Sequence, residues 1–134
     1  MKIIDVPEKM QKFYGTGKML HPDVEMVEEQ LKSIPMGKVT LVDALCKKLS
    51  SEYGTDVACP MRTTAAIKKI TESYIHHESN DLMPYWRIVR TNHLLINSPY
   101  LEICASKLGK EGFTIDMTNK GNYKVTDIQD RIFD

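Results

Sequence analysis

The segment from Met83 to Leu95 limits the possible folds more than any other stretch of the chain, because it joins a rigid turn to strand-forming residues. Pro84 fixes its own φ angle and biases Met83 toward extended conformations. The single tryptophan, Trp86, lies two residues later, and an arginine and two β-branched residues follow it. This order predicts a turn that leads directly into a β-strand.

A short hairpin is predicted in the second half of this segment. Arg87–Arg90 and Leu94–Ile96 are β-prone runs, and Thr91–His93 separates them. Within the separator, Asn92 tolerates the left-handed backbone conformation that hairpin loops require. We therefore expect two short strands joined by a tight loop.

Three amphipathic helices are predicted upstream of the hairpin. The first runs from Asp23 to about Ser33, and the second from Leu41 to about Leu49, with Thr40 positioned to cap it. The third spans Pro60–Tyr74 and has proline in the favoured first turn. The last two helices, joined by a short connector, predict a helix-turn-helix.

The helix over Pro60–Tyr74 carries a small, basic outer stripe. Arg62, Ala65, Ala66 and Lys69 cluster opposite its apolar face at helical spacing. Small residues let a helix approach a DNA groove, and the two cations reach phosphates or base edges. The alternative interpretation is an ordinary solvated helix face.

Two motifs resemble the DNA-binding domain of the O6-alkylguanine-DNA alkyltransferases. Ile34-Pro35-Met36-Gly37-Lys38-Val39 is similar to the Ile-Pro-x-Gly-x-Val entry of that domain, and Pro84-Tyr85-Trp86-Arg87 to its Pro-Cys-His-Arg motif. The resemblance spans Ile34–Phe113. It implies an α+β fold, a mainly helical winged helix-turn-helix with a small β-hairpin wing over Arg87–Ile96.

The resemblance also implies that the transfer chemistry is missing. Tyr85 stands at the nucleophilic cysteine position and Trp86 at the histidine position. A last helix is expected after the hairpin, with Ser98 and Pro99 as its cap and first turn and Gly112 as its end, and by its register Ala105 stands at the carboxylate position. Alkyl transfer needs a thiolate activated by a neighbouring base, so no transfer is expected here. The pattern is closer to the alkyltransferase-like proteins, which lack the nucleophile, bind alkylated guanine in DNA and recruit other repair factors.

A pocket for a base turned out of the duplex is expected beside this motif. The resemblance places Val42 and Thr64 at the family's tyrosine and arginine positions. Aromatic rings are the usual platform for an extruded base. The alternative is that the two rings are ordinary core aromatics beside a turn. The predicted lining of the pocket is Val42, Thr64, Pro84, Tyr85 and Trp86.

Arg87 and Arg90 complete the predicted DNA contacts. The resemblance implies that Arg87 anchors the loop or a phosphate. Net charge is zero over the whole chain, yet between Met36 and Thr71 the sequence has six basic residues and only three acidic ones. A locally basic surface is therefore predicted on a neutral protein.

One domain with two extensions is expected. Residues 1–33 are predicted as a helical N-terminal extension, including a short helix over Pro7–Tyr14, and residues 34–113 as the alkyltransferase-like winged-helix domain. Residues 114–134 are predicted as a C-terminal hairpin followed by a helical turn that Thr126 caps.

No cofactor, metal or membrane segment is expected. Cys46, Cys59 and Cys104 lack the paired spacing of a zinc site or a disulfide framework, and the adjacent His76 and His77 point apart on a helix. No apolar run is long enough for a signal peptide or a membrane span. A cytoplasmic protein with reduced thiols is predicted.

These features predict a non-enzymatic alkyltransferase-like protein that binds double-stranded DNA at alkylated guanine, with a repair protein as a further partner. Two alternatives stay open. A divergent methylated-DNA–protein cysteine methyltransferase would use Cys59, because a helix N-terminus lowers the pKa of a thiol. A winged-helix module that binds protein through its aromatic loop fits the zero net charge and the missing arginine.

Overall fold

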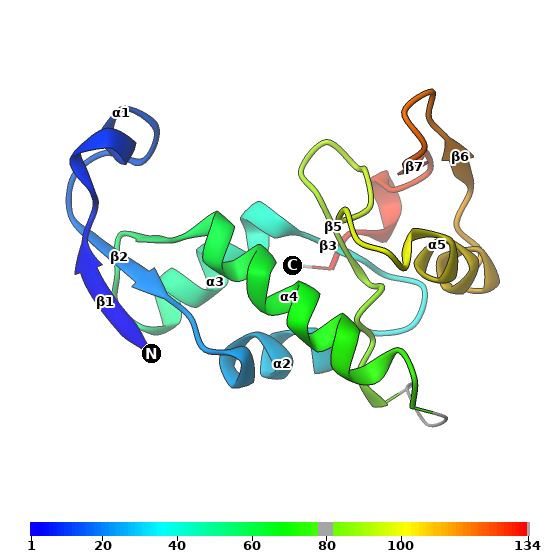
Figure 1. Ribbon diagram of the computed structural model, residues 1–134, viewed down its shortest axis with the longest axis horizontal. Helices are drawn as coiled ribbons and strands as arrows, with labels where there is room; N and C mark the ends of the chain where they lie inside the picture. Colours follow the sequence, from blue (N-terminus) through cyan, green and yellow to red (C-terminus); the bar gives the residue numbers. More distant parts are fainter. Residues whose placement is uncertain (78–81, 134) are drawn as a thin grey trace.

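The computed structural model describes residues 1–77 and 82–133 and shows a mixed α+β fold (Figure 1). Helices and short strands alternate along most of this length. In chain order they are β1 (Lys2–Asp5), η1 (Glu8–Met10), α1 (Gln11–Tyr14), β2 (Lys18–His21), α2 (Val24–Lys32), β3 (Thr40–Leu41), α3 (Val42–Glu52), β4 (Val57–Ala58), α4 (Pro60–Tyr74), β5 (Ile88–Val89), α5 (Leu101–Lys110), β6 (Ile115–Met117), β7 (Tyr123–Val125) and η3 (Gln129–Arg131).

Helices α2, α3 and α4 build the main core. In Figure 1, α4 runs diagonally across the centre of the molecule, and both α2 and α3 contact it. Each helix buries one aliphatic face, and each buried side chain of this kind contributes about 1.5–3 kcal/mol. The predicted apolar faces are thus confirmed, with α3 extending to Glu52. The buried aliphatic residues include Val27, Leu31, Leu45, Leu49, Ile67 and Ile70.

The segment before α2 is a β-hairpin rather than a purely helical extension. β1 pairs antiparallel with β2, and β2 pairs parallel with β4, which gives a three-stranded sheet in the order β1-β2-β4. The predicted short helix is present between the strands as η1 and α1, and it ends at Gly15 with φ +74°. Periodicity does not reveal these strands, because pairing with the distant β4 stabilises them.

Strand β5 pairs with a partner that the sequence does not indicate. It lies parallel to β3, with Thr40 opposite Ile88 and Leu41 opposite Val89. The Thr40 hydroxyl donates a hydrogen bond to the Phe133 carbonyl at 2.9 Å, and Leu41 is the N-cap of α3. The predicted capping role of Thr40 is therefore wrong, because this residue belongs to the strand.

A tight turn follows β5, as predicted, but its left-handed residue differs, and Leu94 and Leu95 form isolated bridges in place of the predicted second strand over Leu94–Ile96. The Arg90 amide donates to the Leu94 carbonyl at 2.8 Å, and Val89 bridges to Leu95. His93 has φ +71°, whereas the Asn92 side chain accepts the Leu94 amide at 3.2 Å. Residues 90–97 are called the 90–97 turn below.

The C-terminal segment packs into the main core. β6 and β7 form the predicted hairpin, and η3 follows with Ile128, not Thr126, as its N-cap. Val39 accepts the Phe133 amide at 2.8 Å and donates to the Arg131 carbonyl at 2.9 Å. Because Ile128 is 1% exposed, this segment contributes to the core that holds α3 and α4.

Candidate nucleic-acid interface

A surface cavity of about 670 Å³ lies between α4 and the 90–97 turn; it is called the α4–turn cavity below. Val42 contributes from the start of α3 and Thr64 from the first half of α4. The structure thus brings together these two members of the predicted base pocket. The complete lining is Val42, Thr64, Lys68, Arg90, Thr91, Asn92, Ile96 and Asn97.

Two exposed cations, Lys68 and Arg90, line this cavity from different elements. Arg90 is a predicted DNA contact, whereas Lys68 is a residue that the sequence interpretation missed. Lys68 lies four positions after Thr64, so it shares the same side of α4. Asn92 and Asn97 add both donors and acceptors to the rim of the cavity. The arrangement can hold an anion and a polar ring edge at once.

Arg62 and Lys69 lie on the opposite flank of α4. They line a second cavity of about 470 Å³, together with Ala65, Ala66 and residues of the N-terminal hairpin. Arg62, Ala65 and Lys69 are exposed as predicted, but Ala66 is 5% exposed because it packs in the main core. The predicted placement of Ala66 on the outer stripe is wrong, and the stripe is narrower than expected.

This second flank carries charges of both signs. Burial and the charges of Arg62 and Lys2 lower the pKa of His21, which favours its neutral form. Asp23 and Glu25 line the same cavity. The more uniformly cationic site is the α4–turn cavity, because its charged lining residues are both basic.

Tyr85 and Trp86 are core residues, with exposures of 2% and 3%. Their rings meet edge to face at 5.0 Å, and Pro84 is buried beside them. The hollow that they line with Ile67 and Cys104 measures about 20 Å³, about the room that one water molecule needs. A base does not fit there. In this conformation the predicted stacking of a base on these rings is wrong, because α4 and α5 close around them.

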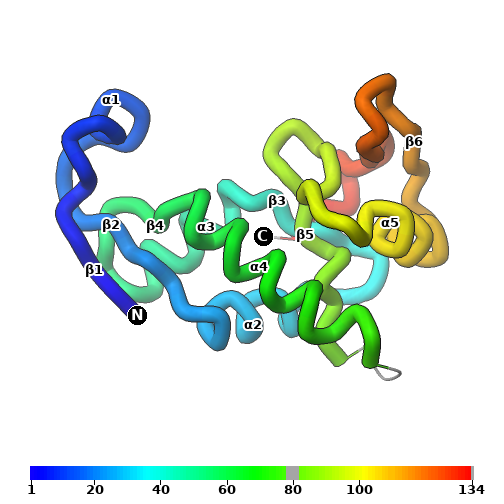
Figure 2. The backbone as a smooth tube through the Cα atoms, viewed as in Figure 1, coloured from blue at the N-terminus to red at the C-terminus, as the bar shows by residue number. Residues whose placement is uncertain are grey.

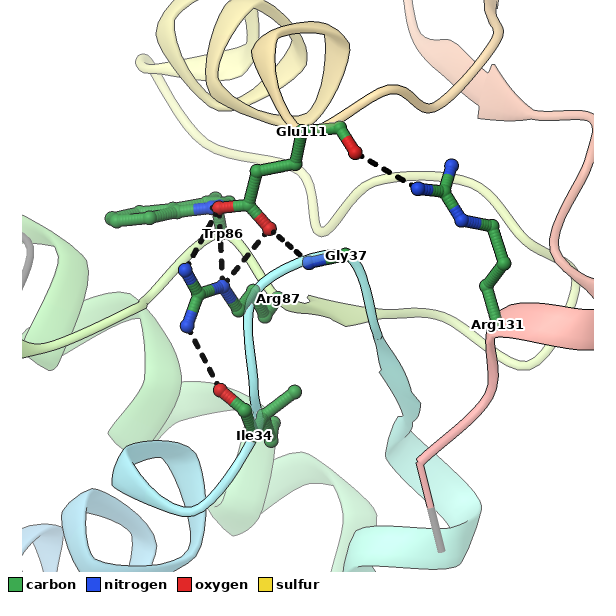
Figure 3. A network of polar contacts seen from close by, with 6 residues as sticks. All are labelled: Ile34, Gly37, Trp86, Arg87, Glu111 and Arg131. Carbon is green, nitrogen blue, oxygen red and sulfur yellow. Dashed lines mark hydrogen bonds and ion pairs between the residues drawn. The ribbon is translucent and has the colours of Figure 1, made fainter.

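Glu111 joins three segments of the chain (Figure 3). Its Oε2 accepts hydrogen bonds from Trp86 Nε1 at 2.6 Å and Arg87 Nη2 at 2.9 Å, and its Oε1 accepts the Gly37 amide at 2.9 Å. Arg87 also donates to the Ile34 carbonyl at 2.8 Å, and its side chain is 10% exposed. Of the two predicted roles of Arg87, the structure shows the loop anchor. The phosphate contact is wrong, because the guanidinium is buried between these partners.

The resemblance places Ala105 at the family's carboxylate position, but the carboxylate that lies beside Trp86 is that of Glu111. Ala105 lies on the buried face of α5, and Glu111 at the C-cap of that helix supplies the carboxylate beside Trp86. Burial alone would raise the pKa of Glu111, but hydrogen bonds from Arg87, Gly37 and Trp86 hold it below its ordinary value. An indole N–H only donates, so this carboxylate orients no base. The pair is a structural anchor.

The three cysteines are poorly placed for nucleophilic chemistry. Cys59 is the N-cap of α4, but it is 3% exposed and packs with Val6 and Met19. Burial raises the pKa of Cys46, and it raises the pKa of Cys104 to about 11. Thiols that stay protonated at neutral pH are weak nucleophiles. The alternative based on Cys59 therefore lacks an accessible thiol in this conformation.

The histidines near the end of α4 pack on aromatic rings. His76 lies edge-on to Tyr100 at 6.0 Å, and His77 is tilted against Tyr74 at 5.6 Å. Among residues 1–77 and 82–133, no three His, Cys, Asp or Glu side chains gather as a metal site. Within the same ranges, no helix combines the length and the apolar character that crossing a membrane demands.

Known proteins were compared at the levels of sequence and structure. No protein-family model and no curated protein matches the sequence. Among solved structures, S. pombe Atl1 in complex with damaged DNA containing O6-carboxymethylguanine has a TM-score of 0.59 at 17% identity, with 83% of this chain and 94% of that chain covered. S. pombe ATL in complex with DNA has a TM-score of 0.57 at 16% identity with the same coverage. The chain thus resembles alkyltransferase-like proteins in its fold, over most of the length of both.

Proposed function

We propose that this protein binds double-stranded DNA as an alkyltransferase-like protein and carries out no alkyl transfer itself. The α4–turn cavity carries the proposal, because it combines a helix, a projecting turn and two exposed cations, Lys68 and Arg90. Both similar structures are complexes with DNA, and one of them contains an alkylated guanine, which supports DNA as the ligand. Tyr85 at the nucleophile position supports the absence of transfer.

In the proposed complex, α4 is the recognition helix of a winged helix-turn-helix and the 90–97 turn is its wing. The exposed, small Ala65 lets the helix backbone approach the groove. Lys68 and Arg90 contact phosphates on one side of the helix, and Arg62 and Lys69 extend the contact along its other side. Phosphate contacts of this kind set position rather than sequence preference.

The α4–turn cavity is the proposed receptor for an extruded guanine that carries an O6-alkyl group. Its volume of about 670 Å³ lies within the range of roughly 300–1,000 Å³ for pockets that hold small organic molecules. Thr64, Asn92 and Asn97 offer hydrogen-bonding groups to the base edge. Val42 and Ile96 offer apolar surface to the alkyl group. The receptor is thus the cavity at Val42 and Thr64 rather than the rings of Tyr85 and Trp86.

A protein-interaction module is a second candidate function, but the predicted contact through the aromatic loop is wrong in this conformation, because Tyr85 and Trp86 are buried. Another surface suits it better. A cavity of about 390 Å³ between α5 and the β6–β7 hairpin is bordered by Ile103 and Met117, which are 44% and 67% exposed. Exposed apolar side chains beside a concavity are typical of protein contacts. This face also suits the proposed repair-protein partner, and it leaves α4 free for DNA.

The binding test uses fluorescently labelled duplexes with either guanine or O6-methylguanine at one position. Because Trp86 is buried and held by Glu111, DNA anisotropy is a better signal than protein fluorescence. We expect tighter binding to the alkylated duplex and weaker binding to both as salt rises. Lys68→Ala and Arg90→Ala should each lower the salt slope by about one, whereas Lys32→Ala on α2 should not. Salt-independent or undetectable binding to both duplexes would contradict the proposal.

A second measurement addresses the transferase alternative. The protein is incubated with O6-methylguanine duplex, and its mass is then determined. We expect no stable mass gain, because the Cys59 thiol is buried. A gain that disappears in Cys59→Ser would show transfer and overturn the non-enzymatic assignment.

A further inference from the structure

A further cavity, distinct from the one at Arg62 and Lys69, adjoins the α4–turn cavity on the side of the N-terminal hairpin. It measures about 460 Å³ and extends from Tyr14 at the end of α1 to Pro60 at the start of α4. Val42 and Thr91 line both cavities. The two cavities therefore adjoin at Val42 and Thr91, and together, from Tyr14 past the start of α4 to Asn97, they are called the groove below.

The N-terminal hairpin ends in an exposed aromatic and basic tip, Lys12, Phe13 and Tyr14. Phe13 is 71% exposed and Tyr14 37%, and their ring centroids lie 6.2 Å apart. The Lys12 ammonium lies 5.0 Å from the centroid of the Phe13 ring. In Figure 2, α1 and the 90–97 turn project toward the same edge of the molecule, with the start of α4 between them. The tip thus stands at one end of the groove and the turn at the other.

The base of the N-terminal hairpin is fixed relative to α4. The Asp56 amide donates to the Lys18 carbonyl at 3.0 Å, and the Lys18 amide donates to Asp56 Oδ2 at 2.8 Å. The Cys59 amide, at the N-cap of α4, donates to the Leu20 carbonyl at 2.9 Å. Met19, at 0% exposure, completes a small core with Cys59. The hairpin that carries the tip is therefore joined at its base to the start of α4.

The end of the groove nearest the tip suits sugars and bases better than phosphates. Its lining includes Tyr14, Val57 and Pro60 as apolar surface, while the single cation Lys47 is outnumbered by the carboxylates of Asp43 and Asp56. Lys12, which is exposed, is the cation available to a phosphate at this end of the groove. Aromatic side chains next to a cation bind the bases and sugars of nucleic-acid strands.

We propose that Lys12, Phe13 and Tyr14 form a second DNA contact, which binds the strand as it leaves the α4–turn cavity along the groove. Phe13 stacks on a base or sugar, Tyr14 lines the groove beneath it, and Lys12 pairs with a phosphate. This inference rests on the proposed function, because α4 must hold the duplex first. The aromatic tip then lengthens the bound site beyond the helix and the turn.

The direct test places a fluorophore at the tip. In Phe13→Trp the new indole is exposed, and stacking on a base should quench its emission when unmodified duplex is added, while the buried Trp86 changes little. The matched control is Met117→Trp on β6. Met117 is 67% exposed, and the new indole there should keep its emission when DNA is added. Unchanged emission of Phe13→Trp under conditions where anisotropy shows bound DNA would overturn the inference.

Affinity provides an independent measurement. Phe13→Ala should weaken duplex binding about tenfold, and Lys12→Ala should lower the salt slope by about one. Both positions are exposed, so the thermal transition should stay unchanged. If the wild-type chain binds DNA and Phe13→Ala binds equally well, the tip contact is wrong and the proposed function stands. If the wild-type chain binds no DNA, both are overturned.

Discussion

Glu111 shows how a single buried charge shapes this site. Its carboxylate accepts hydrogen bonds from Trp86, Arg87 and the Gly37 amide, and its side chain is 7% exposed. A buried carboxylate is tolerated only when it is paired and its lone pairs are satisfied. These contacts hold the Pro84 segment against α5, and this fixes the strand that leads into the 90–97 turn.

Replacing Glu111 should therefore destabilise the fold. Glu111→Ala leaves the Arg87 guanidinium buried without its charge partner, and we expect a loss of about 3–5 kcal/mol in the free energy of unfolding, measured by urea denaturation. Glu102→Ala, on the exposed face of the same helix, should change stability by less than about 0.5 kcal/mol. Equal effects of the two substitutions would contradict the anchoring role.

The same carboxylate makes stability depend on pH. Because the folded protein holds the pKa of Glu111 below its ordinary value, the ionised form is stabilised by folding. This contribution is complete above the unfolded-state pKa of about 4.3 and is lost as pH falls through the lower folded value. Urea midpoints from about pH 3 to pH 6 should fall more steeply at the acid end for the wild type than for Glu111→Gln.

At the scale of elements, α4 is shared by two surfaces. Thr64 and Lys68 face the α4–turn cavity, Arg62 and Lys69 face the N-terminal hairpin, and Ala65 is exposed between them. One helix thus presents cations on both flanks of a small residue. This is the geometry expected of a helix whose backbone approaches a groove.

A glutamate in place of the exposed Ala65 should block DNA binding without unfolding the protein. Ala65→Glu is expected to weaken duplex binding by about tenfold or more, because it places like charge and added volume against the phosphates. Ser73→Glu, exposed two turns further along α4, is the matched control. Binding is read by anisotropy and folding by circular dichroism; equal affinities of the two variants would argue against α4 as the recognition helix.

The N-terminal hairpin depends on one glycine for its connection to β4. Gly17 has φ +122°, and a Cβ atom there would overlap the Asp56 carboxylate, whereas Gly15 has φ +74° and open space around it. An alanine adopts the backbone of either glycine only with strain of about 1–3 kcal/mol, and we expect Gly17→Ala to destabilise the hairpin more than Gly15→Ala because of the added overlap with Asp56. Amide hydrogen exchange in β1 and β2 should show the difference, and equal protection in both variants would contradict the role of Asp56.

At the scale of the whole molecule, the two chain ends support the central helices. The N-terminal hairpin joins β4 just before α4, and the C-terminal segment pairs with Val39 just before β3. Figure 1 shows the N-terminal hairpin on one side of α3 and α4, and β6 and β7 on the other side. Net charge is zero, so DNA binding must depend on where the cations lie rather than on total charge.

Removing residues 114–134 should therefore abolish cooperative folding. The deletion removes Val125 and Ile128, which are 0% and 1% exposed, and the pairing to Val39. Loss of one such buried side chain costs about 2–5 kcal/mol, against a total stability of about 5–15 kcal/mol for a domain. Met117→Ala, in the same segment but exposed, should keep a cooperative thermal transition. A truncated chain that melts cooperatively would show that the segment is dispensable.

The sequence by itself determined where the central helices form and which known fold the chain resembles. Apolar spacing and Pro60 at a first turn predict α4 to the residue, since these signals act within a few positions along the chain. The Ile34–Val39 and Pro84–Arg87 motifs indicate the alkyltransferase-like fold, which the structural comparison confirms.

Only the tertiary structure decided the strand pairing and the site. Whether Tyr85 and Trp86 line a pocket or fill the core depends on how α4 and α5 close around them. The Glu111 anchor joins residues 24 and more positions apart, and β3 pairs with a strand that lies beyond two helices. Contacts of this range depend on packing of the whole chain, so no local pattern specifies them.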